Sequence, residues 1–305
     1  MSAHGKPRLA ITRLAIIGFG EAGQAIAAGL REEGVTEIAA WDILFPSPEG
    51  ERLRHAAEAS GARIAASAQD AIRDSEVIIA AVTAASSYEA AQSVSGNLTG
   101  APFYLDVNSV SPGRKQATAR LLGEGARYVD VAILSPIHPK RHKSPLLIAG
   151  PHADAVAPVL NALGMVFTMA GAETGAAAAI KMVRSVMIKG LEALTLECFL
   201  AAQRAGVVEE VAASLRNNYP SLDWGKIAEY NIERMASHGG RRAAEMEEVA
   251  DTLRELGVEP LMVNATVRRQ RDMGALGKQE TIKATLDQGR AAMLPAISAA
   301  ARDRH

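Results

Sequence analysis

The first half of the chain is organised around one stretch, Leu14-Ala15-Ile16-Ile17-Gly18-Phe19-Gly20-Glu21-Ala22-Gly23. Four apolar residues run into Gly-x-Gly-x-x-Gly, and a helical pattern of small and apolar residues follows. A dinucleotide-binding turn requires this order of buried strand, tight turn and helix. Gly18 allows the turn, Gly20 leaves room for a pyrophosphate, and Gly23 lets the helix pack close to the strand. The free N–H groups at the start of the helix would face the phosphates.

An acidic residue follows at the spacing that such a site needs. A second apolar stretch, residues 37–41, ends in Asp42, at about the 20-residue spacing where an acid holds the ribose hydroxyls. The other interpretation is a glycine-rich turn of an unrelated α/β protein, with Asp42 merely ending a strand. The order of strand, glycines, helix, strand and acid favours the nucleotide site. We predict that the cofactor is bound by Gly18, Phe19, Gly20, Glu21, Ala22, Gly23 and Asp42.

The composition is that of a globular protein with ample material for a core. Of its 305 residues, 48% are hydrophobic and 22% charged, and the net charge of −1 gives no strong field toward nucleic acid or a membrane. Charges interrupt the apolar run 175–200, which argues against a transmembrane helix. The start, Met1–Arg8, is polar with no apolar signal core, so we expect a cytoplasmic protein. The single cysteine, Cys198, excludes an intramolecular disulfide, and we expect a buried thiol.

Strand and helix patterns alternate up to residue 171 and only helical patterns follow. The alternation predicts a doubly wound, mostly parallel sheet covered by helices on both faces. We therefore expect a Rossmann domain over residues 1–171 and an all-helical domain over 172–305. The helices expected in the second domain span 173–205, 208–217, 223–235, 242–256, 261–273 and 286–301.

This layout, with a lysine early in the first long helix, resembles the β-hydroxyacid dehydrogenases. The family includes 3-hydroxyisobutyrate dehydrogenase, tartronate semialdehyde reductase and 6-phosphogluconate dehydrogenase. The segment 238–246, His-Gly-Gly-Arg-Arg-Ala-Ala-Glu-Met, resembles a poorly characterised 6-phosphogluconate-dehydrogenase-like branch. The resemblance implies hydride transfer between a nicotinamide and a β-hydroxy acid or sugar acid, and a small anionic substrate.

Carried over residue by residue, the resemblance assigns the reacting groups. Lys181 matches the catalytic lysine, and Ser185 stands where the family has asparagine. Asp106–Ser109 corresponds to the family's Asp-Ser-Ser-Thr, so we expect the nicotinamide end to pass Val82 and Thr83 toward Asn108 and Ser109. The substrate-binding Ser-Gly-Gly falls on Leu134-Ser135-Pro136, where two glycines are lost. That departure changes the backbone amides that would receive a substrate carboxylate.

The residues around Lys181 favour the same chemistry. Burial in an apolar helix lowers the pKa of a lysine, and a lysine with a pKa near the working pH can exchange a proton with a hydroxyl. Lys181, Ser185 and Lys189 fall on one helical stripe, with Arg184 beside them. The alternative is that these charges extend to solvent at the domain edge.

Two further basic segments stay open between a substrate site and a solvated surface. The segment 135–143 holds Ser135, His138 and several cations, which would suit a carboxylate or phosphate. Its prolines make a helical metal-binding pair of histidines improbable, so we predict no metal. His238 and Arg241 are expected in a loop that enters a helix, where an anion would bind, or in a helix start paired with acids.

Asp42 is followed by Ile43 and Leu44, with no cation to receive a 2′-phosphate, so we predict NAD as the cofactor. The alternatives are an imine reductase, in which the lysine is often replaced, and a nucleotide-binding protein without turnover. An apolar face over 175–200, too wide for one neighbouring domain, predicts a homodimer joined through the helical domains.

Overall fold

The computed structural model describes residues 13–302, so the polar start Met1–Arg8 lies outside the described residues. The chain divides into two compact units, Met1–Lys181 and Met182–His305. The division falls inside one long helix, α7 (Ala176–Ala205). The boundary expected after residue 171 lies between the last strand and this helix, whereas the first residues of α7 group with the sheet.

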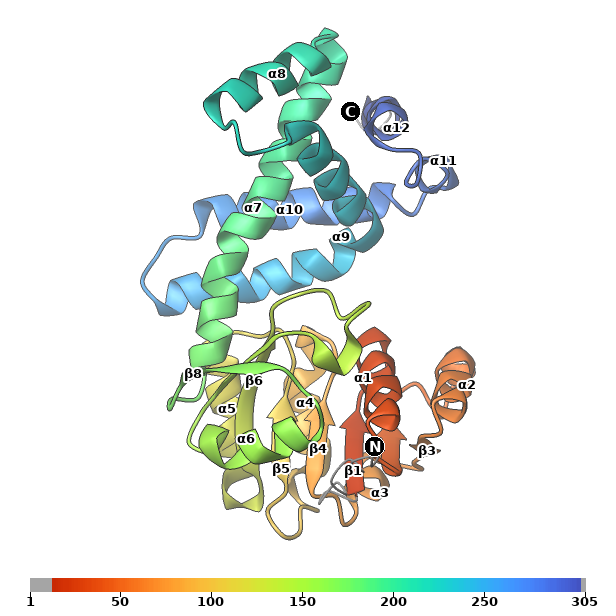
Figure 1. The fold of residues 1–305 in the computed structure, drawn as a ribbon, viewed down its shortest axis with the longest axis vertical. Helices are drawn as coiled ribbons and strands as arrows, with labels where there is room; N and C mark the ends of the chain where they lie inside the picture. Colours follow the sequence, from red (N-terminus) through yellow and green to blue (C-terminus); the bar gives the residue numbers. More distant parts are fainter. Residues whose placement is uncertain (1–12, 303–305) are drawn as a thin grey trace, which may run out of the picture. The chain divides into compact units, whose positions relative to one another are not determined.

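The first unit is built on an eight-stranded sheet with the order β3-β2-β1-β4-β5-β6-β7-β8 (Figure 1). The strands are β1 (Arg13–Ile17), β2 (Glu37–Trp41), β3 (Arg63–Ile64), β4 (Val77–Ala80), β5 (Phe103–Asp106), β6 (Arg127–Ile133), β7 (Leu146–Ala149) and β8 (Phe167–Gly171). Neighbouring strands are parallel except β6 and β7, which are antiparallel. This is the predicted doubly wound, mostly parallel sheet.

Helices cover both faces because each strand alternates its side chains between two cores. Leu14 and Ile16 pack in one core with α1, α2 and α6, whereas Ala15 and Ile17 pack in the other with α3, α4 and α5. The helices are α1 (Glu21–Glu32), α2 (Glu51–Ala59), α3 (Ala68–Ile72), α4 (Ser87–Ser95), α5 (Pro112–Leu122) and α6 (Ala153–Ala162).

The order of the strands places the glycine turn at the switch point of the sheet. β1 lies between β2 and β4. Strands β2 and β3 therefore extend the sheet on one side of β1, and β4 to β8 extend it on the other. Ligands of such sheets bind beyond the carboxyl ends of the strands at this point. The carboxyl ends of β1, β4 and β5 lead into Gly18, Ala81 and Val107 respectively, which brings the predicted cofactor residues to one edge of the sheet.

In the described part of the second unit every regular element is helical. Besides α7 these are α8 (Val208–Asn218), α9 (Trp224–Glu255), α10 (Leu261–Leu276), the short α11 (Glu280–Lys283) and α12 (Arg290–Arg302). No helix in the described range 13–302 is long and apolar enough to cross a membrane. The sequence patterns missed α11 and began α12 four residues early, since short helices and frayed ends carry weak signals.

The predicted break near residue 238 is wrong, because α9 is one continuous helix of 32 residues. Its glycines serve close packing and not a turn. A methyl group at Gly239 would overlap the carbonyl oxygen of Gln270, and one at Gly274 would overlap the backbone nitrogen of Gly240. Helices α9 and α10 therefore meet backbone to backbone at these positions. Cys198, expected to be buried, is exposed on α7.

Candidate functional site

The glycine turn is tight at its first and last glycines and open at the middle one. Gly18 adopts φ +92°, and a Cβ there would lie 2.5 Å from the carbonyl oxygen of Ala81. A Cβ on Gly23 would overlap the carbonyl oxygen of Gly18, so α1 packs against the turn. A Cβ on Gly20, by contrast, meets nothing within 4 Å. The turn is thus closed on the protein side and open at Gly20, where the start of α1 offers N–H groups to an anion.

Asp42 is held against this turn by two backbone groups. Its Oδ2 accepts from the N–H of Phe19 at 2.7 Å, and its Oδ1 accepts from the N–H of Leu44 at 3.0 Å. The ring of Phe19 is buried and packs against Phe45, so its side chain belongs to the core and does not face a ligand. Ile43, directly beside Asp42, is 81% exposed. It forms an apolar surface next to the carboxylate, which the sequence patterns did not predict.

Asn108 links the ends of β4 and β5. Its Oδ1 accepts from the N–H of Val82 at 2.7 Å, and its own N–H donates to Oδ1 of Asp106 at 3.0 Å. Its side chain is only 4% exposed, yet Nδ2 has no hydrogen-bond partner. A buried amide without a partner costs free energy, which fits a donor held for a ligand oxygen. Thr83, one residue after Val82, is bonded to Ser86 at 3.1 Å.

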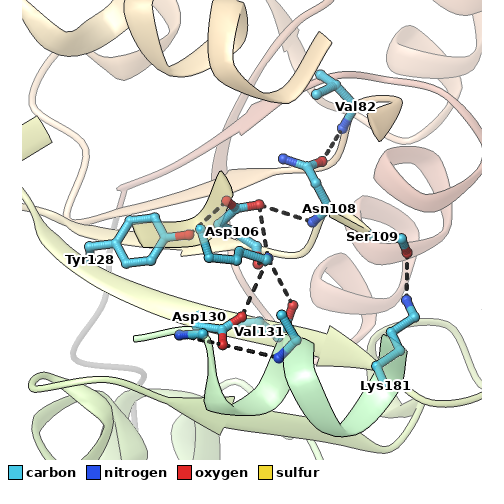
Figure 2. Close-up of polar contacts among 11 residues, drawn as sticks. Val82, Asp106, Asn108, Ser109, Tyr128, Asp130, Val131 and Lys181 are labelled. Carbon is cyan, nitrogen blue, oxygen red and sulfur yellow. Dashed lines mark hydrogen bonds and ion pairs between the residues drawn. The ribbon is translucent and has the colours of Figure 1, made fainter. Parts of the chain in front are cut away.

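Lys181 and Ser109 come together although they are far apart in the sequence. The Lys181 Nζ donates to the Ser109 Oγ at 2.5 Å, in a partly buried position (Figure 2). Ser109 follows β5 in the loop that also holds Asn108, and Lys181 lies in the second turn of α7. An amine and a hydroxyl in this arrangement can pass a proton to or from an oxygen placed beside them.

The basic segment 135–143 is tied down by its own unit. Arg141 pairs with both carboxylate oxygens of Glu32, and the Lys143 Nζ lies 2.7 Å from Glu33. His142 is buried under α1, and burial lowers its pKa. These contacts give Arg141, His142 and Lys143 partners within the first unit, and so favour a surface segment over a substrate site for these three residues. Ser135 bonds to the neighbouring Pro136 carbonyl, and His138 is exposed.

The remaining predicted residues lie in the second unit. Lys189 is buried and its Nζ lies 2.8 Å from Glu245, to which Arg241 also pairs at 4.0 Å. Ser185 is buried one turn after Lys181 on α7, and His238 lies in the middle of α9. His238 and Arg241 are therefore not at a helix start, so the helix-terminus argument for an anion at these two residues is wrong.

A buried charged cluster that the sequence patterns did not predict lies between the end of β5 and the middle of β6. The cluster consists of Lys115, Asp106, Asp130 and Tyr128, all buried (Figure 2). Asp106 and Asp130 are register partners on two parallel strands, a pairing that no local pattern in the sequence reveals. The two acids needed a cation, and the nearest lysine in the following helix supplies it.

Comparisons with known proteins find matches to both units of the chain. The family described as NADP oxidoreductase, coenzyme F420-dependent, matches residues 13–107, and a domain of unknown function, DUF1932, matches residues 202–273. The conserved hypothetical protein from Sinorhizobium meliloti 1021 is 34% identical, with a TM-score of 0.74 over 94% of this chain and 96% of its own.

Two other solved structures have the same fold. Conserved protein MTH1747, described as of unknown function and similar in structure to 3-hydroxyacid dehydrogenases, is 29% identical, with a TM-score of 0.67 over 86% of this chain and 97% of its own. The 3-hydroxyisobutyrate dehydrogenase of Mycobacterium tuberculosis, with L-serine, is 16% identical, with a TM-score of 0.71 over 87% of this chain and 94% of its own.

Proposed function

We propose that this chain, a member of the same family as the conserved hypothetical protein from Sinorhizobium meliloti 1021 and similar in fold to 3-hydroxyisobutyrate dehydrogenase, transfers hydride between NAD and a small β-hydroxy acid or sugar acid. The observation that carries the proposal is the 2.5 Å pairing of Lys181 Nζ with Ser109 Oγ. This pairing holds the Lys181 amine beside Ser109, the residue that follows Asn108. Both lie at the same edge of the sheet as the glycine turn.

The residues present fit a dinucleotide. The open face of Gly20 and the N–H groups at the start of α1 suit the pyrophosphate. The carboxylate of Asp42, aimed by its two backbone donors, suits a pair of ribose hydroxyls and would repel a 2′-phosphate, which supports NAD over NADP. The unpartnered Nδ2 of Asn108 suits an oxygen at the nicotinamide end. When bound, the nicotinamide supplies or accepts the hydride.

Lys181 acts as the general acid and base in this proposal. Its Nζ takes the proton of the substrate hydroxyl as hydride leaves the same carbon, and it returns that proton in the reductive direction. The hydrogen bond that this amine donates to the Ser109 Oγ fixes the direction in which the amine points. Ser185, one turn further on α7, is the second residue that we assign to this step, as a group that orients the amine or the substrate.

Ser135, in the segment that follows β6, is our first choice for the acidic end of the substrate. His138 of the same segment is exposed, so it can contribute. Lys189, buried in the second unit and paired with Glu245, is kept as a separate candidate. His238 and Arg241 remain candidates for binding the substrate through their side chains, which α9 carries.

The test of this function is a scan of pyridine-nucleotide absorbance against a panel of β-hydroxy acids, sugar acids and their oxo forms. Cyclic imines are included because an imine reductase shares this architecture. Turnover of an acid that disappears in Lys181→Ala supports the proposal. Turnover of imines alone, or NADH binding with no turnover of any panel member, contradicts it in favour of the two alternatives.

We also propose that the protein forms a homodimer through its helical units. One stripe of α7 carries large apolar side chains that are exposed in the single chain, at Ile180, Val183, Met187, Leu191 and Leu194. They recur every three or four residues, which aligns them on one face of the helix. Contiguous apolar surface of this kind marks a protein–protein interface.

A further inference from the structure

The buried cluster between the end of β5 and the middle of β6 is centred on a single amine, the Nζ of Lys115. Lys115, in the first turns of α5, is 1% exposed. Its Nζ donates to the backbone oxygens of Asp106, at 2.5 Å, and Val131, at 3.3 Å. The same nitrogen lies 3.2 Å from Oδ1 of Asp106 and 3.5 Å from Oδ1 of Asp130. A buried lysine with four oxygens around it ties the end of β5 to the middle of β6.

Through Asp130, the cluster contacts the start of α7. Oδ2 of Asp130 accepts from the backbone N–H groups of Gly175 and Ala178, each at 3.1 Å. Asp130 thus satisfies free donors at the N-terminus of α7, and its negative charge is favourable there. Ala178 lies three residues before Lys181, so this contact fixes the helical turn that carries the amine.

Through Asp106, the cluster contacts the loop that carries Ser109. Oδ1 of Asp106 accepts from the N–H of Asn108, and its Oδ2 accepts from the hydroxyl of Tyr128 at 2.8 Å. Asp106 therefore holds the residue before Ser109 while Lys115 holds Asp106 itself (Figure 2).

Helix α5 also touches the start of α7 directly. The Gln116 Nε2 donates to the backbone oxygen of Thr174 at 3.2 Å, and a Cβ on Gly175 would come within 3.1 Å of Pro112. The contact needs the glycine, whose φ is +101°. The starts of α5 and α7 are therefore packed against each other as one rigid joint around Lys115.

We propose that Lys115 is a positioning residue, which sets Ser109 and Lys181 at hydrogen-bonding distance by joining Asp106 to Asp130. The proposal rests on the proposed function for its catalytic meaning, since it concerns the same proton-transfer pair. It adds that the geometry of the pair is imposed from inside the core, by a side chain that contacts neither the cofactor turn nor the pair itself.

The test uses the full-length protein and separates positioning from stability. Lys115→Met alone leaves two buried carboxylates without their cation and should lower the melting temperature. Adding Asp130→Asn removes the surplus charge and keeps an oxygen for Gly175 and Ala178, so the double variant should recover most of that melting temperature. It does not restore the bonds from the amine to Asp106 and Val131.

Two readouts are taken on each variant. The first is the rate at which an N-hydroxysuccinimide ester acetylates Lys181, measured by peptide mass spectrometry relative to Lys226, whose side chain is 88% exposed. The second is turnover of the best acid from the panel. We expect the double variant to acetylate Lys181 several-fold faster than wild type and to lose about tenfold or more in kcat, with KM little changed.

Val156→Ala, a core truncation on the buried face of α6 in the same unit, is the control for general loosening. If it raises the Lys181 acetylation ratio as much as the Lys115 variants do, or if the double variant regains wild-type ratio and kcat together with its melting temperature, the proposal is overturned. Should the double variant not fold, Asp130→Asn alone is compared with Val156→Ala on the same readout. If no acid is turned over, the proposed function fails while the acetylation ratio still decides the positioning role.

Discussion

Asp42 contacts the glycine turn and is the residue that we expect to select the cofactor. Its carboxylate bonds the turn through Phe19 and its own loop through Leu44, so its direction is fixed before a nucleotide arrives. A carboxylate so placed gains hydrogen bonds from ribose hydroxyls and repels a phosphate in their place. The exposed Ile43 and Leu44 beside it supply apolar surface and no cation.

Asp42→Ala should therefore weaken NADH by about tenfold or more, the value of one charge-assisted hydrogen bond of roughly 1.5 kcal/mol, and should affect NADPH much less. Gly20→Ala is the matched control, because its methyl group enters the space assigned to the pyrophosphate that both cofactors share. It should weaken both alike. Calorimetric titration of the two cofactors measures this, and wild-type binding of NADPH as tight as NADH would refute the assignment.

Helices α9 and α10 show how far local sequence patterns reach. The helices expected over 173–205 and 208–217 agree with α7 and α8 to within three residues at each end, because helical periodicity is a strong local signal. The glycines of α9 gave the wrong result because the same residue permits a turn or a close helix contact. The choice is made by Gln270 and Gly274, which lie some thirty residues further along the chain, beyond the reach of a local pattern.

The candidate site divides in the same way. The glycine turn, Asp42 and Lys181 follow from spacing and resemblance. The Lys115 cluster needs the register of β5 against β6, and the pairing of the basic segment with Glu32 and Glu33 needs the position of α1. Neither can be obtained from residues close in sequence.

The packing of α9 on α10 can be tested with two neighbouring glycines. Gly239→Ala should destabilise the protein by about 1–3 kcal/mol, since its methyl group would overlap the backbone of α10. Gly240→Ala, whose methyl group would meet nothing within 4 Å, should stabilise by up to about 1 kcal/mol because alanine favours a helix. Denaturant unfolding of both variants gives the comparison. Equal effects would mean that α9 is not packed at Gly239 as described.

At the scale of the whole molecule, the exposed stripe of α7 determines the expected assembly. Met187 is 72% exposed at its centre, and Cys198 lies further along the same face. A dimer that buries the stripe would shield both.

Met187→Arg should therefore convert the dimer to a monomer at micromolar concentration, as measured by light scattering, because it places an unpaired charge in an apolar interface. Alkylation of Cys198 should become faster in the same variant. Tyr230→Arg, at a side chain 57% exposed on α9, is the control and should leave the assembly unchanged. Wild-type protein that is monomeric under these conditions would exclude the dimer.

The central claim is that the amine of Lys181 exchanges a proton with the substrate. Lys181→Ala keeps the helix, and Lys181→Arg keeps the charge but cannot release its proton near neutral pH. Ser185→Ala, which removes only an orienting hydroxyl, should cost less than either.

The measurement that tests this claim most directly is the turnover of Lys181→Arg on the best acid of the panel, with NADH affinity measured in parallel. We predict a loss in kcat of about a hundredfold or more, close to that of Lys181→Ala, with NADH affinity little changed. Wild-type turnover in Lys181→Arg would contradict the account, because the lysine would then be a charge that holds the substrate and the proton would pass through another group.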